Sequence, residues 1–101
     1  MGSKQVEFHE QALAEAQAAY DWYAERSPAA AEAFITELDE AIDQIQVFPN
    51  SGAVHLSGSR RQVMKRFPFS VIYREREEIV EVVAVAHGRR RPGYWKKRIK
   101  H

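Results

Sequence analysis

The chain has 101 residues, 45% of them hydrophobic, and its 15 lysines and arginines nearly balance 14 acidic residues, so the net charge is +1. This length suits one domain with its own core, and the absence of cysteine excludes disulfides and thiolate metal sites. No apolar run reaches the roughly 20 residues that cross a bilayer, and nothing resembles a signal peptide, so we expect a soluble, cytoplasmic protein without membrane contact. We expect a single domain over residues 1–101 with its core at 4–98, and Met1-Gly2-Ser3 as an addition left by cloning.

The small net charge hides a division between the two halves of the chain. Residues 1–59 hold two basic and ten acidic side chains, a net −8, whereas residues 60–101 hold thirteen basic and four acidic ones, a net +9. This asymmetry indicates a basic surface for an anionic partner. The alternative is that the halves attract each other within the fold, but exposed ion pairs add little stability and do not require such segregation.

The first 50 residues predict a strand and two helices. Residues 4–8 alternate in polarity, which is typical of a short half-buried strand, and residues 10–26 follow helical spacing. The expected apolar stripe of this helix is Leu13, Ala16, Tyr20 and Tyr23.

A second helix begins at Ser27-Pro28, where serine suits the N-cap and proline the first helical position. It ends at Pro49-Asn50, and the short link between the helices predicts an antiparallel hairpin. The expected apolar stripe of this second helix is Phe34, Leu38, Ala41, Ile45 and Phe48.

The second half predicts three strands. A Gly/Ser-rich loop at 50–59 leads to strand-like segments at 60–66 and 69–74, which Phe67-Pro68 separates. After a turn at 76–78 comes a strand at 79–87 whose residues are nearly all apolar, which is typical of burial on both faces. The sequence therefore predicts an α+β fold: an N-terminal strand, an antiparallel helical hairpin packed on an antiparallel sheet, and a final three-strand meander.

Two consecutive chain reversals have a geometric consequence for the basic residues. The corner at 66–68 and the exit of the last strand at 87–89 should lie at the same end of the sheet. We therefore expect Lys65, Arg66, Arg89, Arg90 and Arg91 to converge there.

A cationic and aromatic segment follows the last strand. Arg89, Arg90 and Arg91 can bind phosphates with bidentate geometry or attract an acidic protein surface. Tyr94 and Trp95 can stack on bases or fold back onto the core, and for Trp95 we expect packing. The predicted target- or phosphate-binding residues are Lys65, Arg66, Arg89, Arg90, Arg91, Lys96 and Lys97.

The histidines and Trp22 have simpler interpretations. By strand alternation His87 shares a side with Val83 and Val85, and we expect it to bond the backbone at the strand end rather than act as a base. The other three, His9, His55 and His101, are scattered without ligand spacing, so we predict no metal site and no cofactor. Trp22 lies at or outside the rim of the first helix's stripe. We predict that it and Trp95 bind a partner, with packing beneath the C-terminal tail as the alternative for Trp22.

An ordered set of short motifs runs through the chain. They are Trp22-Tyr23, Ala33-Phe34, Ile42, Ile45, Phe48-Pro49, Arg66-Phe67-Pro68-Phe69, Val71-Ile72-Tyr73, residues 82–87, Arg91-Pro92 and Tyr94-Trp95. This set resembles the ParE/RelE superfamily of type II toxin–antitoxin toxins, and more closely its ParE-like, plasmid-stabilisation branch, over about residues 4–98. The resemblance implies a helical hairpin against an antiparallel sheet.

The same resemblance implies a growth-inhibiting toxin that binds a cytoplasmic target, DNA gyrase, and that a cognate antitoxin neutralises. One alternative is RelE-like mRNA cleavage on the ribosome, in which Arg66 (or Lys65), Arg89 and Tyr94 would be the catalytic residues. If Trp95 takes the tyrosine position instead, it cannot transfer a proton. A degenerate, non-toxic member that only binds its antitoxin is the third option. A homodimer stays open, although no heptad pattern requires one.

Overall fold

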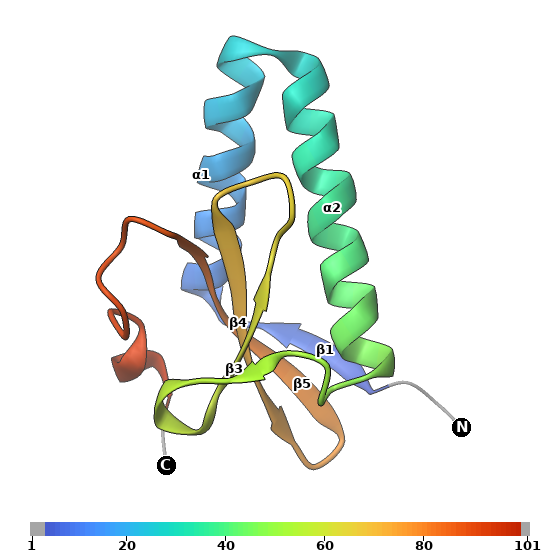
Figure 1. The fold of residues 1–101 in the computed structure, drawn as a ribbon, viewed down its shortest axis with the longest axis vertical. Coiled ribbons are helices and arrows are strands. Elements are labelled where there is room, and N and C mark those ends of the chain that lie inside the picture. Colours follow the sequence, from blue (N-terminus) through green and yellow to red (C-terminus); the bar gives the residue numbers. More distant parts are fainter. Residues whose placement is uncertain (1–3, 100–101) are drawn as a thin grey trace.

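A computed structural model describes residues 4–99, which form two helices and one five-stranded sheet (Figure 1). The elements are β1 (Gln5–Phe8), α1 (Glu10–Arg26), α2 (Pro28–Val47), β2 (Ala53–Val54), β3 (Arg60–Val63), β4 (Phe69–Arg76) and β5 (Ile79–His87), with short 3₁₀ turns η1 (Leu56–Gly58) and η2 (Lys96–Arg98). Met1-Gly2-Ser3, expected to be a cloning addition, and His101 lie outside the described residues.

A single residue, Ser27, links α1 to α2 in the helical hairpin. Its backbone N–H donates to Tyr23 O at 2.7 Å and closes α1, while its hydroxyl accepts from Ala30 N at 3.2 Å and caps α2. This confirms the predicted N-cap and the proline at the first helical position. Within residues 4–99, neither helix is long and apolar enough to cross a membrane.

The predicted apolar stripe of α1 is wrong at its first member. Leu13 is 54% exposed, and the buried residues are Ala12, Ala16 and Ala19. Alanines let α1 lie close to β5, because a small side chain separates the two backbones least. The stripe of α2 is correct at Phe34, Leu38 and Ile45, but Phe48 is the exposed C-cap of the helix.

The sheet has the order β1-β5-β4-β3-β2. The meander β3-β4-β5 is antiparallel as predicted, whereas β1 pairs with β5 in parallel, so the sheet is mixed. Two further details differ from the sequence prediction. The predicted loop at 50–59 contains the short edge strand β2, and β3 stops at Val63 instead of reaching residue 66.

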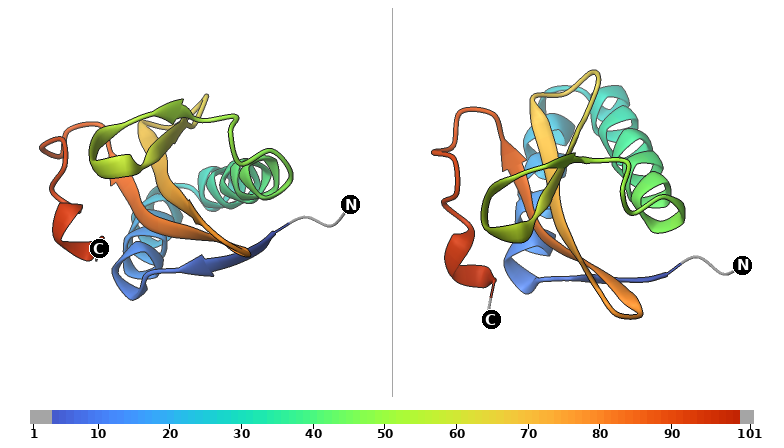
Figure 2. Two further views of the ribbon diagram at one scale, coloured as in Figure 1. Left: turned by 90° about the horizontal axis from the view of Figure 1, so that it is seen from below. Right: turned by 60° about the horizontal axis from the view of Figure 1, so that its bottom comes forward.

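Both faces of the central strands are covered, as the apolar run in β5 predicts (Figure 2). The helices cover one face, where Val80, Val82 and Val85 are buried. The C-terminal segment covers the other face, where Trp95 and Ile99 pack on β4 and β5. The α+β fold with a hairpin on one sheet face is confirmed, and the chain after β5 supplies a second, smaller core.

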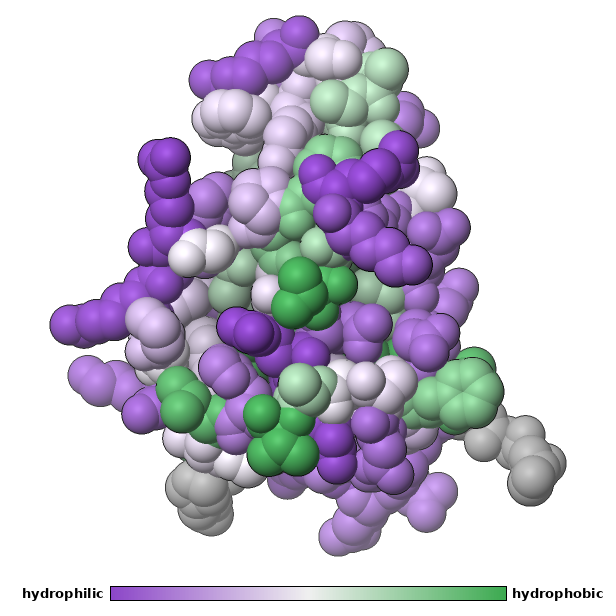
Figure 3. Space-filling view, viewed as in Figure 1, coloured by the Kyte–Doolittle hydropathy of each residue, from purple (hydrophilic) through white to green (hydrophobic). Residues whose placement is uncertain are grey.

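The outer surface is mostly polar with separate apolar spots. Figure 3 shows hydrophobic patches isolated among hydrophilic side chains on the face that carries β2 and β3. The exposed large apolar residues are Leu13, Trp22, Val47, Phe48, Val54, Leu56 and Val63. Scattered exposure of this kind is ordinary and does not by itself indicate a partner.

Candidate functional site

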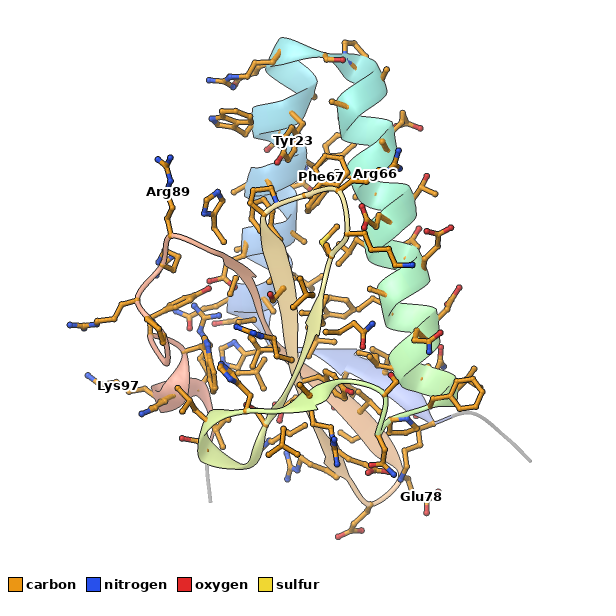
Figure 4. All side chains as sticks on the ribbon, viewed as in Figure 1. Tyr23, Arg66, Phe67, Glu78, Arg89 and Lys97 are labelled. Carbon is orange, nitrogen blue, oxygen red and sulfur yellow. The ribbon has the colours of Figure 1, made fainter. Side chains whose placement is uncertain are left out.

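The two predicted corners meet at one end of the sheet. Phe69 pairs with His87 across β4 and β5, and Gly88 N donates to Pro68 O at 2.7 Å. The loop between β3 and β4 therefore touches the exit of β5, as two consecutive reversals require. The tip of this loop is fixed by Phe67, whose ring packs edge-on against Tyr23 and Phe34 at 5.1 and 5.5 Å (Figure 4).

The basic side chains at these corners do not form one cluster. Figure 4 shows Arg66 on the β3–β4 loop directed towards α2, and Arg89 projecting away from it, from the segment after β5. Lys65 and Arg66 line a depression of about 530 Å³ shared with α2, whereas Arg89 lines a different groove beside α1. The expected convergence of all five cations is wrong for the side chains, although it is right for the backbone corners.

Glu37 is the reason that the β3–β4 loop faces α2. This side chain is 8% exposed, and its carboxylate accepts hydrogen bonds from the backbone amides of Lys65 and Arg66 and lies 3.8 Å from Arg66 Nε. These amides would otherwise extend β3. Carboxylate bonds to backbone N–H groups are strong because the acceptor is charged, so β3 ends at Val63.

A second carboxylate, that of the partly buried Glu15 of α1, fastens the C-terminal segment. Arg98 binds it with both terminal nitrogens, at 3.0 and 2.9 Å, and Tyr94 donates its hydroxyl to Glu15 Oε2 at 2.7 Å. Glu15 and Arg98 also form hydrogen bonds with backbone groups of β5 beyond the point where its pairing with β1 ends. Val85 N donates to Glu15 Oε1, and Arg98 donates to Val83 O. We call Glu15, Tyr94 and Arg98 the C-terminal clasp.

The clasp shifts the proton affinities of its members. Burial alone would raise the pKa of Glu15, but hydrogen bonds from Arg98, Tyr94 and the Val85 amide outweigh it and lower that pKa below its ordinary value. Burial, together with the hydrogen bond to Glu15, raises the pKa of the Tyr94 hydroxyl well above its ordinary value. Tyr94 is therefore held as a neutral donor, which is a poor state for a general base.

The lowered pKa of Glu15 predicts how the stability of the fold depends on pH. A carboxyl whose pKa is depressed in the folded state stabilises the fold above its unfolded pKa, and this contribution is lost as the pH falls through the folded pKa. We expect the unfolding free energies of the wild type and Glu15→Gln, measured in urea, to differ most near neutrality and to approach each other below about pH 4. A difference that stays constant with pH would contradict the assignment.

A mostly apolar groove of about 480 Å³ runs between α1 and the C-terminal segment. Trp22 lies at its rim, 52% exposed, with the guanidinium of Arg26 stacked 3.7 Å from its ring centroid. Arg89 and Arg90 line the other wall, and Arg90 stacks 3.7 Å over the Tyr94 ring. Apolar walls beside unpaired positive charge suit an acidic segment that carries an apolar side chain.

The remaining predicted site residues have different environments. Trp95 is 2% exposed in the second core, which confirms packing, so its predicted role in partner binding gains no support from this position. His87 Nδ1 accepts from Arg89 N at 3.0 Å, the expected backbone bond at a strand end. Lys96 and Lys97 are exposed on η2, and among residues 4–99 neither forms an ion pair.

Sequence reasoning missed the two carboxylates that organise this end of the molecule. Glu15 and Glu37 look like ordinary members of two acidic helices, and Arg98 looks like one more cation in a basic tail. Along the sequence, Arg98 lies 83 residues from Glu15, and Lys65 and Arg66 lie 28 and 29 residues from Glu37. No local spacing signals such contacts.

Comparisons with known proteins agree with this fold. A family model described as the ParE toxin of type II toxin-antitoxin system, parDE, matches residues 6–92. A solved structure described as the chromosomal ParDE TA system from P. aeruginosa matches with a TM-score of 0.73 and 22% identity, over 84% of this chain and 96% of that chain. At this identity the structural likeness shows the fold alone. No curated protein sequence matches the chain.

Proposed function

The chain belongs to the ParE toxin family of type II toxin–antitoxin systems, and from this membership we propose that it arrests growth by binding DNA gyrase in the cytoplasm. We propose further that a cognate antitoxin neutralises it by covering part of the same surface. The solved relative is described as a ParDE system, in which a toxin and an antitoxin are paired, and we extend that pairing to this chain.

The observation that carries the proposal is the row of unpaired cations after β5. Arg89, Arg91, Lys96 and Lys97 are exposed, and within residues 4–99 their side chains form no hydrogen bond or ion pair. Figure 3 shows long hydrophilic side chains projecting from this edge of the molecule. Charge of one sign on one edge speeds association with an acidic protein surface and selects against basic ones.

The groove beside α1 suits the antitoxin. An acidic antitoxin segment would place an apolar side chain against Trp22 and Tyr23 and its carboxylates near Arg89 and Arg90. The exposed ring of Trp22, already stacked with Arg26, is the kind of side chain that contributes most to a protein interface.

Cleavage of mRNA has weaker support. Tyr94, the candidate proton-transfer residue, donates to Glu15 and has a raised pKa, so it is unsuited to accept a proton from a 2′-hydroxyl. Of the candidate phosphate ligands, Arg66 projects from the β3–β4 loop towards α2, whereas Arg89 projects away from it, from the segment after β5 (Figure 4). A binding toxin needs neither a free base nor this convergence.

Supercoiling by purified gyrase tests the target. We expect the wild-type protein to inhibit supercoiling, and Arg89→Gln/Arg91→Gln to require at least about tenfold more protein for the same inhibition, because two charged contacts are lost. The control Arg76→Gln removes one positive charge, half the change of the double variant, from the end of β4 away from the tail, and it should change inhibition less than about twofold.

Three outcomes would contradict the gyrase proposal. Full supercoiling activity in the presence of wild-type protein removes gyrase as the target. Discrete cuts in transcripts after induction, mapped by primer extension, would favour ribosome-dependent cleavage. Harmless expression without an antitoxin would favour a non-toxic member that only binds its antitoxin.

A further inference from the structure

A small pocket beside the second core has a lining rich in positive charge. Its volume is about 120 Å³, and it lies between the strands and the C-terminal segment, on the side of Ile72 and Trp95. The polar residues that line it are His55, Arg61, Ser70, His87, Arg90, Arg91 and Tyr94, although the ring of His87 itself packs against Phe69 on the helix side of the sheet. Among the described residues that line it, none is acidic.

The donors of this pocket are largely unused. Arg61 and Arg91 form no hydrogen bond or ion pair with any side chain or backbone group of residues 4–99, and neither does the Ser70 hydroxyl. Two guanidinium groups and a hydroxyl therefore border one small space that no acidic residue among those described lines.

The positive charge around the pocket already affects the pKa of His55, one of its lining residues. Burial lowers the pKa of His55, and the positive charge of Arg61 lowers it further. An anion in the pocket would offset the repulsion between these groups.

The size and donor count favour one kind of anion. A volume of about 120 Å³ equals the share of roughly four water molecules in the liquid, which suits a tetrahedral oxyanion but leaves no room for a base or sugar. A carboxylate offers two oxygens, whereas a terminal phosphate offers three and up to two charges. The abundance of donors therefore matches phosphate better.

We propose that this pocket binds the terminal phosphate of a nucleotide or of a nucleic-acid end, with Arg61 and Arg91 as charged ligands and Ser70 as a neutral donor. The base and sugar lie outside the pocket. This site shares Arg91 with the edge proposed for gyrase but differs from it otherwise: it also uses Arg61 of β3, and the two lysines of η2 do not line it. It does not depend on the gyrase proposal.

Calorimetric titration of the purified chain with AMP, inorganic phosphate and adenosine tests the site. We expect AMP and phosphate to bind with Kd on the order of 1 mM or below, and adenosine not to bind. Tighter binding of AMP than of phosphate would identify a nucleotide as the source, and equal binding would identify the phosphate group as the whole ligand.

Two substitutions and a matched control locate the binding. Arg61→Gln and Arg91→Gln should each weaken phosphate binding at least about tenfold, since each removes a charged hydrogen-bonding partner. Arg76→Gln changes the net charge equally but lies at the end of β4, outside this pocket, and should alter the affinity less than about twofold.

A second measurement uses the wild type alone, so it tests the site even if the variants fail to fold. In the wild type, NMR shifts induced by phosphate should concentrate at His55, Ser70 and Arg91. Any of three results would overturn the proposal: no binding of phosphate or AMP, equal weakening by Arg76→Gln, or binding at these residues by a glutamate-rich peptide alone. Since the purified chain suffices, these outcomes are independent of gyrase inhibition.

Discussion

Replacing Arg98 with methionine is expected to lower the free energy of unfolding by about 3 kcal/mol, a large part of the stability of a small domain. Arg98 and Glu15 are only 12% and 17% exposed at the side chain, and the guanidinium binds both carboxylate oxygens and Val83 O. Methionine retains much of the aliphatic packing but leaves the carboxylate of Glu15 buried with fewer donors. The cost is dominated by this uncompensated charge.

Urea unfolding followed by circular dichroism measures the effect. The adjacent residue provides the control: Lys97→Ala removes an exposed cation from the same 3₁₀ turn and should change stability by less than about 0.5 kcal/mol. The double variant Glu15→Gln/Arg98→Met should lose less than the sum of the single changes, because both act on one ion pair. Additive losses, or equal losses at Arg98 and Lys97, would contradict the role of the clasp.

The clasp explains part of the charge division in the sequence. Two ion pairs, Glu15–Arg98 and Glu37–Arg66, join an acid of the first half to a base of the second. Attraction between the halves within the fold is therefore real. It does not account for Arg89, Arg91, Lys96 and Lys97, which have no ion pair within residues 4–99, so the need for an anionic partner remains the better explanation of the tail.

The arrangement of elements could be predicted because local signals dominate it. The Ser27-Pro28 cap, the Phe67-Pro68 corner and the apolar run of β5 each determine one boundary, and the structure agrees at all three. The parallel pairing of β1 with β5 has no such local signal, because it depends on where the helices return the chain.

Side-chain placement within β5 could not be predicted by alternation. The register with β4 shifts between Ile72 and Tyr73, and the extra residue on β5 lets Val83 and Ala84 both face the second core. Val85 returns to the helix side, so His87 shares a side with Val85 but not with Val83. A bulge among similar apolar residues has no signature in the sequence.

Helix α1 is a second place where the sequence pattern does not predict which side chains are buried. Leu13 and Ala12 differ by one position, about 100° around α1, and hydrophobicity alone selects leucine for the core. In the structure Ala12 is the buried residue, because α1 lies against β5 and the C-terminal segment. Long-range packing, invisible in the periodicity, decides which residue is buried.

The two tryptophans are expected to respond oppositely to truncation. Trp95→Ala should lower the free energy of unfolding by about 3–5 kcal/mol, because its ring is buried in the second core and a cavity would remain. For a domain of this size each 1 kcal/mol corresponds to roughly 4–8 °C, so thermal unfolding should report a large drop in Tm.

Trp22→Ala is the matched comparison, with the same change of volume at an exposed ring. Its cost in stability should stay within about 1 kcal/mol, the size of the contact with Arg26. Its effect should fall on association instead: an aromatic hot-spot contact is worth about 2 kcal/mol, so the affinity for the antitoxin should drop roughly thirtyfold. Unchanged affinity would remove Trp22 from the interface, and a loss of stability as large as that of Trp95→Ala would make it a core residue.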